Sequence, residues 1–145
     1  MLKKKIAVAL MTFTGLVVTP MVALATAYGY EYWGGFEATL SGKGASTTVR
    51  IPSGQLLHGI DGDGYHINWD GANFISAKNL CEPSIKFTYG YGSYSFKSDV
   101  NPGCSIKGQW KYSLNWNAPR GDACAELWSK NWRVFVARQC HYISP

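Results

Sequence analysis

The sequence predicts an all-β protein, a small antiparallel β-sandwich or barrel stapled by two disulfide bonds. Apolar and polar residues alternate with a period of two along most of the chain from residue 28 onward, as they do in strands with one buried face. Gly, Asn, Asp and Pro separate these stretches, and helical periodicity is almost absent. The spacing fits about nine short strands, which a sandwich and a barrel accommodate equally well.

The first 27 residues are typical of a signal peptide. Lys3–Lys5 give a positively charged start, the run Ile6–Thr26 carries no charge, and Ala25–Ala27 ends it with small residues. Because a signal peptidase recognises small side chains at the first and third of those positions, we expect cleavage after Ala27. The product is then one secreted, extracellular domain spanning residues 28–145, since this length suits a single core.

An uncleaved membrane anchor is the alternative interpretation of this leader, because 21 uncharged residues are long enough to span a bilayer. Pro20 and the alanine-rich end of the run favour cleavage, so we expect no stable membrane anchor. The chain resembles small exported bacterial β proteins in this leader alone.

The charge of the predicted mature chain is nearly balanced. Removing Lys3–Lys5 from the 14 basic residues leaves 11 against 9 acidic residues, and the Lys and Arg are scattered singly. Nucleic acid requires clustered basic residues that displace counterions, so we expect no nucleic-acid partner.

The expected strands follow one another in chain order. Residues 28–35, rich in tyrosine, form either an ordered edge strand or a loose arm. Alternating stretches then occur at 36–40, 47–51, 56–60, 65–69 and 74–77. The clearest strand spans 106–116, because its even-numbered positions include the apolar residues Ile106, Trp110, Tyr112, Leu114 and Trp116.

Two predicted hairpins place the four cysteines in pairs. Residues 84–97 alternate around a turn at 90–93, which puts Cys81 and Cys104 near the open end of that hairpin. Residues 124–139 alternate around a turn at 129–131, which puts Cys124 beside Cys140. We therefore expect the bridges Cys81–Cys104 and Cys124–Cys140, formed outside the reducing cytoplasm.

The cysteine spacing also bears on cofactors. The separations of 23, 20 and 16 residues lack the close pairs of a zinc site, and pairing removes the thiolate that a catalytic cysteine needs. We expect no metal and no other cofactor.

Aromatic residues are the main candidates for a binding surface. The chain after residue 27 keeps 20 of the 21 aromatics, and we expect about two thirds of them to fill the core. The remainder are expected to lie exposed on loops, where Tyr and Trp favour recognition. The candidate ligand-binding residues lie near the predicted N-terminus and in two hairpin turns: Tyr28, Tyr30, Tyr32, Trp33, Tyr91, Tyr94, Trp128 and Trp132.

An Asp- and Gly-rich segment spans residues 59–71. Carboxylates on such a backbone bind calcium in EF-hand loops, which makes Asp61 and Asp63 weak metal candidates. Counted from Asp61, however, the fifth and twelfth positions are Tyr65 and Ala72, which supply no carboxylate. We expect a hairpin turn at 61–64 instead, because Asp-Gly favours tight turns.

Groups for catalysis are sparse. His58 and His66 are expected to face each other across that hairpin, with Asp61, Asp63 and Asp70 nearby, which is the best acid–base cluster that the sequence offers. The usual nucleophile and phosphate-binding motifs are missing. His141 follows Cys140 directly, which favours a structural role.

These features predict a secreted, non-enzymatic binding protein that uses exposed aromatic loops, with an antimicrobial or inhibitory role as one version. The expected partner is an extracellular protein or an envelope polysaccharide. The alternative is a small secreted hydrolase that uses His58, His66 and a nearby Asp.

Overall fold

The computed structural model describes residues 25–145, and this part of the chain contains strands and turns but no helix. The predicted signal peptide lies outside the described residues except for Ala25–Ala27, which open the first strand. The strands in order are β1 (Ala25–Trp33), β2 (Phe36–Gly42), β3 (Ala45–Ile51), β4 (Gly54–Asp63), β5 (His66–Cys81), β6 (Ser84–Tyr89), β7 (Tyr94–Lys97), β8 (Cys104–Asn117), β9 (Gly121–Ser129) and β10 (Val134–Ile143).

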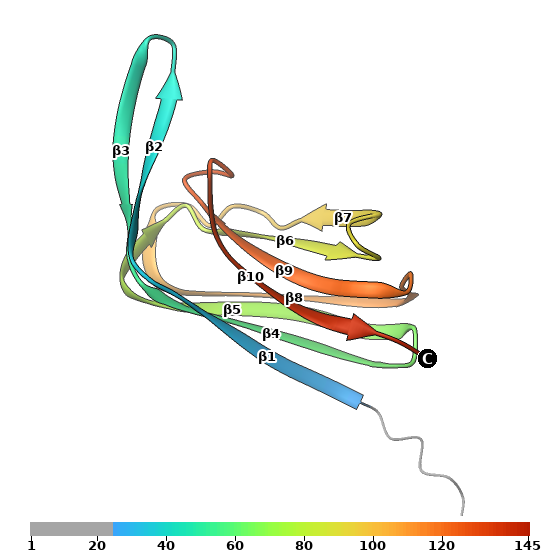
Figure 1. Cartoon of the computed structure of the whole chain (residues 1–145). Coiled ribbons are helices and arrows are strands. Elements are labelled where there is room, and N and C mark those ends of the chain that lie inside the picture. The colour runs from blue at the N-terminus through green and yellow to red at the C-terminus, as the bar shows by residue number, and fades with distance from the viewer. Residues whose placement is uncertain (1–24) are drawn as a thin grey trace, which may run out of the picture.

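Two four-stranded antiparallel sheets form the body of the protein. The first sheet has the strand order β1-β4-β5-β8, and the second has the order β10-β9-β6-β7. They lie as two layers with the core between them (Figure 1). The structure is therefore a β-sandwich, which settles the choice between sandwich and barrel that strand spacing leaves open.

Inward-facing side chains of both sheets fill the core. Phe74 from the first sheet and Phe87 and Leu127 from the second are all fully buried. The alternation predicted for 106–116 holds along most of β8, since Trp110 is buried and Tyr112, Leu114 and Trp116 pack against the core from the same face.

Ile106 departs from this pattern, because 52% of it is exposed. It lies where the pairing of β5 with β8 shifts between Ile75 and Leu80. This irregularity in the ladder interrupts the inward face at the start of β8.

The two strands predicted at 65–69 and 74–77 are one strand. β5 runs without a break for 16 residues, and Asp70 and Gly71, which resemble a turn in the sequence, pair with neighbours on both sides. Both neighbouring strands supply backbone partners for this segment, so it stays extended.

The remaining strand predictions are confirmed with shifted ends. Residues 28–33 belong to the edge strand β1 rather than to a loose arm, and the hairpin predicted at 84–97 is β6–β7 with its turn at 90–93. The last hairpin, β9–β10, is longer than predicted, and its turn contains Lys130, Asn131 and Trp132, which all have positive φ.

The hairpin β2–β3 is a separate two-stranded sheet that projects from the sandwich (Figure 1). Ala38, Leu40 and Val49 on one of its faces are partly buried against the core cluster. Arg133 in the β9–β10 turn donates a hydrogen bond to the carbonyl oxygen of Ser41 at 3.3 Å. These contacts join the projecting hairpin to the second sheet.

Both predicted disulfides are present. Cys124 and Cys140 lie opposite each other on β9 and β10, as expected. Cys81 is bonded to Cys104 beyond the open end of the β6–β7 hairpin, as expected, and the two residues also pair the end of β5 with the start of β8. Disulfides of this kind are typical of proteins that fold in an oxidising compartment.

Candidate functional site

The first sheet has an outer face that no described strand covers. Between the register shifts of this sheet its residues alternate with those that enter the core, so they are the even-numbered residues 26–32 of β1 and the odd-numbered residues 55–61 of β4, 69–75 of β5 and 107–113 of β8. We call this surface the outer face: Thr26, Tyr28, Tyr30, Tyr32, Gln55, Leu57, Gly59, Asp61, Trp69, Gly71, Asn73, Ile75, Lys107, Gln109, Lys111 and Ser113.

Strand register arranges the outer face in rows that cross the sheet from β1 to β8. One row contains Tyr28, Gly59, Gly71 and Lys111. The adjacent rows place Trp69 on one side of the two glycines and Asn73 on the other. The glycines therefore form a depression between rows that carry larger side chains.

A groove of about 250 Å³ lies over this depression, lined by Tyr28, Leu57, Trp69, Asn73, Gln109 and Lys111 together with the glycines. The rings of Tyr28 and Trp69 are neighbours, with centroids 6.3 Å apart and an angle of 47° between their planes. A Cβ atom at Gly59 would lie 2.8 Å from the Tyr28 ring and 3.3 Å from the Trp69 ring. Any larger residue at position 59 would push these rings apart.

Lys111 supplies a positive charge beside the groove. Its Nζ lies 4.1 Å from the centroid of the Trp69 ring, in a cation–π contact. Asp61 is the one carboxylate of the outer face, and it accepts hydrogen bonds from Thr26 Oγ1 at 2.6 Å and from Asn68 Nδ2 at 3.0 Å. These two bonds lower the pKa of Asp61, so it is ionised at neutral pH and already has two donors.

The predicted ligand-binding residues of β1 are divided between the two faces of the sheet. Tyr30 and Tyr32 lie on the outer face, 59% and 67% exposed, with ring centroids 5.3 Å apart. Trp33 is buried on the opposite face, where its indole nitrogen donates to the carbonyl oxygen of Pro52. The tyrosines are on a strand rather than on a loop, because β1 is fully paired with β4.

The other predicted ligand-binding residues belong to the second sheet. Tyr91 is exposed in the β6–β7 turn, and Tyr94 packs on Trp116 with centroids 4.8 Å apart. Trp128 and Trp132 are partly buried and contact each other at 6.4 Å between centroids. The candidate residues therefore do not converge on a single site.

A buried polar cluster connects the two sheets. Tyr89 on β6 donates a hydrogen bond to Asp70 Oδ2 at 2.6 Å, and His58 Nε2 lies 2.8 Å from Asp70 Oδ1. Because all three side chains are fully buried, no substrate reaches them. Burial, with the neighbouring Asp70 charge second, raises the pKa of Tyr89 far above its usual value, so the phenol keeps its proton and acts as donor.

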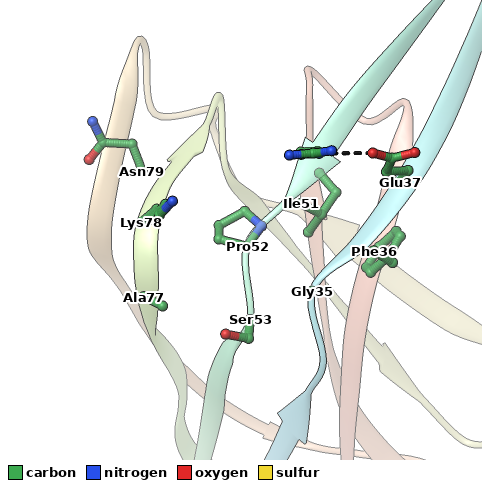
Figure 2. A pocket seen from close by; sticks show the side chains of 10 residues that line it. Gly35, Phe36, Glu37, Ile51, Pro52, Ser53, Ala77, Lys78 and Asn79 are labelled. Carbon is green, nitrogen blue, oxygen red and sulfur yellow. Dashed lines mark hydrogen bonds and ion pairs between the residues drawn. The ribbon is translucent and has the colours of Figure 1, made fainter.

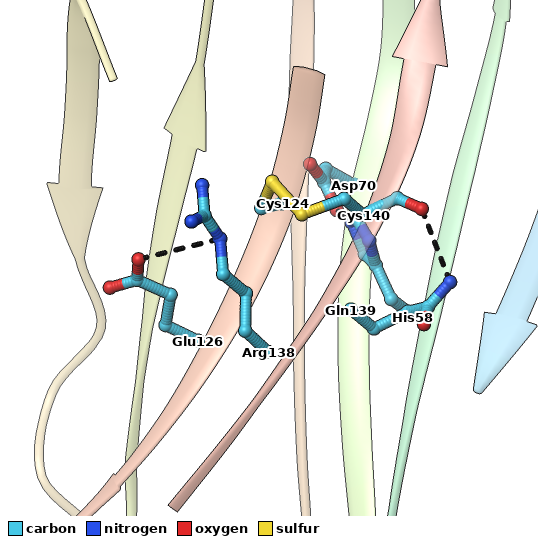
Figure 3. The surroundings of a disulfide bond; sticks show 7 residues. All are labelled: His58, Asp70, Cys124, Glu126, Arg138, Gln139 and Cys140. Carbon is cyan, nitrogen blue, oxygen red and sulfur yellow. Dashed lines mark hydrogen bonds and ion pairs between the residues drawn. A yellow bond between two sulfur atoms is a disulfide. The ribbon is translucent and has the colours of Figure 1, made fainter. Parts of the chain in front are cut away.

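His141 extends this cluster toward β10. Its Nε2 lies 3.1 Å from the carbonyl oxygen of His58, and the two imidazole rings are 4.8 Å apart. Burial lowers the pKa of His141, which favours the neutral ring that donates one hydrogen bond. His58 and Asp70 lie beside the Cys124–Cys140 disulfide (Figure 3). The contact of His141 with His58 therefore places His141 next to this buried cluster, in agreement with the structural role expected for it.

The predicted pairing of His58 with His66 is wrong. His58 lies opposite Ala72 and points into the core, whereas His66 lies opposite Asp63 beside the turn. The imidazole of His66 contacts the side-chain oxygens of Asn117 and Asn115 at 2.9 and 3.0 Å, and these two bonds raise its pKa. The residues named for a hydrolase do not meet.

The hairpin predicted around residues 61–64 exists, but its turn is displaced. Asp61–Asp63 belong to β4, and the turn is Gly64-Tyr65. Gly64 has a φ of 56°, which favours glycine. Among residues 25–145 no group of three or more His, Cys, Asp or Glu side chains is arranged to hold a metal ion.

A second cavity lies at the base of the projecting hairpin. It has a volume of about 410 Å³, and Arg50 and Glu37 form an ion pair of 2.8 Å at its rim. Ile51 and Pro52 lie between this pair and Lys78 (Figure 2). Phe36 is the one aromatic among the described residues that line it, whereas three exposed tyrosines lie on the outer face, so the outer face is the stronger candidate.

Sequence reasoning missed the central residues of the outer face. Gly59 and Lys111 are far from Trp69 and Gly71 in the sequence, and antiparallel pairing brings them together. The alternation within each strand marks them as a set that points away from the core. Their order across the sheet depends on how β4 pairs with β5. A turn at 61–64, as predicted, would give a different pairing from the observed turn at 64–65.

Comparisons with known proteins add no relative: no family model, curated protein or solved structure matches the chain. Within the described residues, no helix is long and apolar enough to cross a membrane.

Proposed function

We propose that this protein is exported and acts outside the cell as a non-enzymatic binding protein, with the outer face of the first sheet as its binding surface. The observation that carries the proposal is the exposure of three tyrosines in a regular strand. Tyr28, Tyr30 and Tyr32 are 74%, 59% and 67% exposed, although each is held by a paired backbone.

Ordered aromatic side chains that remain outside the core favour binding over packing. Large apolar groups on a rigid surface give contact area at a small cost in side-chain entropy. Other aromatic residues form the core, namely Phe74, Phe87, Tyr89 and Trp110. Export is supported by the predicted leader and by two disulfides, which are stable outside the reducing cytoplasm.

The test compares two pairs of exposed tyrosines. Purified protein is incubated with cellulose, chitin, peptidoglycan, pectate gel, alginate gel and beads that carry extracellular proteases. We expect one of these to retain the protein, and we expect the double variant Tyr30→Ala/Tyr32→Ala to weaken retention about tenfold or more, as loss of two anchor side chains does.

The matched control is Tyr91→Ala/Tyr142→Ala, which removes two tyrosines of similar exposure, 68% and 55%, from the second sheet. This control should bind like the wild type, and circular dichroism should show that both variants are folded. Equal binding by both variants, a loss confined to the control, or retention by none of these materials would contradict the proposal.

A further inference from the structure

The outer face combines stacking surfaces with hydrogen-bonding groups. Aromatic rings flank the groove at Tyr28 and Trp69, while Asn73 and Gln109 lie together in the next row. Aromatic faces contact the apolar C–H face of a sugar ring, and side-chain amides both donate to and accept from hydroxyl groups. A depression one residue wide between such groups suits a flat, hydroxylated ring.

The row of tyrosines gives this surface a direction. Tyr28, Tyr30 and Tyr32 follow one another on the same face of β1, so they span about 13 Å along the strand. Side chains of β8 at positions 107, 109 and 111 run parallel to them on the far side of the sheet. An extended chain is therefore contacted along its length rather than at one end.

The outer face carries more positive than negative charge. Lys107 and Lys111 both lie on it, and both are exposed. Asp61, its one carboxylate, already accepts from Thr26 and Asn68. The face therefore complements an anion, and Lys111 holds its ammonium group at the groove itself, 4.1 Å from the Trp69 ring.

We infer that the outer face binds an acidic polysaccharide, a glycan chain that carries carboxylates. One sugar ring lies in the groove over Gly71, beside the Tyr28 and Trp69 rings that cover Gly59, and Lys111 binds its carboxylate. This inference rests on the proposed function and adds the chemical class of the ligand. A protein partner would place aliphatic and aromatic groups on the same surface, without a requirement for repeated carboxylates.

The experiment measures dissociation constants by isothermal titration calorimetry at low salt. The probes are pectate, alginate and hyaluronan oligosaccharides, with methyl-esterified pectate oligosaccharide as a neutral ligand of the same backbone and poly-glutamate as an acidic peptide. We expect at least one acidic glycan to bind about tenfold or more tightly than both the ester and poly-glutamate, since a charge-assisted contact contributes that much.

Lys111→Gln is expected to weaken binding of that glycan about tenfold. The matched control is Lys97→Gln, because Lys97 Nζ lies 4.7 Å from the centroid of the Trp132 ring in a similar contact on the second sheet. This control should bind within about twofold of the wild type.

Three results would overturn the inference. Equal binding of the acid and its ester would remove the role of the carboxylate, and equal binding of poly-glutamate would show recognition of charge alone. Failure of all three acidic glycans to bind would remove the ligand class. In each of these cases the proposed function is still supported if another material retains the wild type and retains the Tyr30→Ala/Tyr32→Ala variant less. The proposed function is contradicted if the variant is retained as well as the wild type.

Discussion

Replacing Asp70 with alanine is expected to lower the free energy of unfolding by about 3 to 5 kcal/mol, because two buried polar side chains lose their shared hydrogen-bond partner. The carboxylate of Asp70 is the shared acceptor for Tyr89 and His58 across the interior. Its removal leaves a buried hydroxyl and a buried imidazole nitrogen without a partner, and each unsatisfied group costs about 1 to 3 kcal/mol.

Urea denaturation followed by tryptophan fluorescence measures this loss. Tyr89→Phe should lower the free energy of unfolding less, by about 1 to 2 kcal/mol, because Asp70 keeps its contact with His58. Asp99→Ala is the matched control, since Asp99 is exposed and its loss should change stability by less than about 0.5 kcal/mol. If Asp70→Ala is as stable as Asp99→Ala, the cluster does not hold the two sheets together.

Removal of the Cys124–Cys140 bridge by a double change to alanine is expected to be more costly than removal of Cys81–Cys104. The bridges close loops with separations of 16 and 23 residues, and chain entropy alone gives about 3 kcal/mol for either one. The surroundings decide the order, because Cys124 is fully buried whereas Cys104 is exposed.

The buried sulfur adds a packing contribution to the entropic one. Removing it beside His58 leaves a void, which adds about 1 kcal/mol, so the expected losses are about 4 and 3 kcal/mol. Thermal unfolding of the two double variants compares them directly. A larger loss of stability for the Cys81→Ala/Cys104→Ala variant would show that loop length, rather than burial, sets the order.

Much of the fold follows from alternation and turn chemistry, and the errors come from pairing at long range. Asp70-Gly71 has the residues of a turn, but β4 and β8 pair with it on both sides and keep β5 extended. Cys81–Cys104 was predicted correctly from the β6–β7 hairpin that lies between the two cysteines, but that hairpin does not show that Cys81 and Cys104 themselves belong to β5 and β8 of the other sheet. Local patterns do not specify which sheet a strand joins.

The candidate site was likewise predicted only where local alternation within one strand is sufficient. The exposed tyrosines of β1 could be named from the sequence, because aromatic residues at every second position of an edge strand share a face. Trp33, at an odd-numbered position, is accordingly buried on the other side. The turn between β4 and β5 lies at 64–65 rather than at the predicted 61–64. His58 therefore does not face His66, and its contact with Asp70 in the buried cluster with Tyr89 could not be predicted from the sequence.

The most direct test of the binding surface is a nuclear magnetic resonance titration of the isotope-labelled protein with a soluble fragment of the polymer that retains it. We expect the largest shifts at the amides of Tyr28, Gly59 and Gly71 and at the indole of Trp69. Shifts concentrated instead at Tyr91, Trp128 or the projecting hairpin would place the binding surface elsewhere and contradict the account.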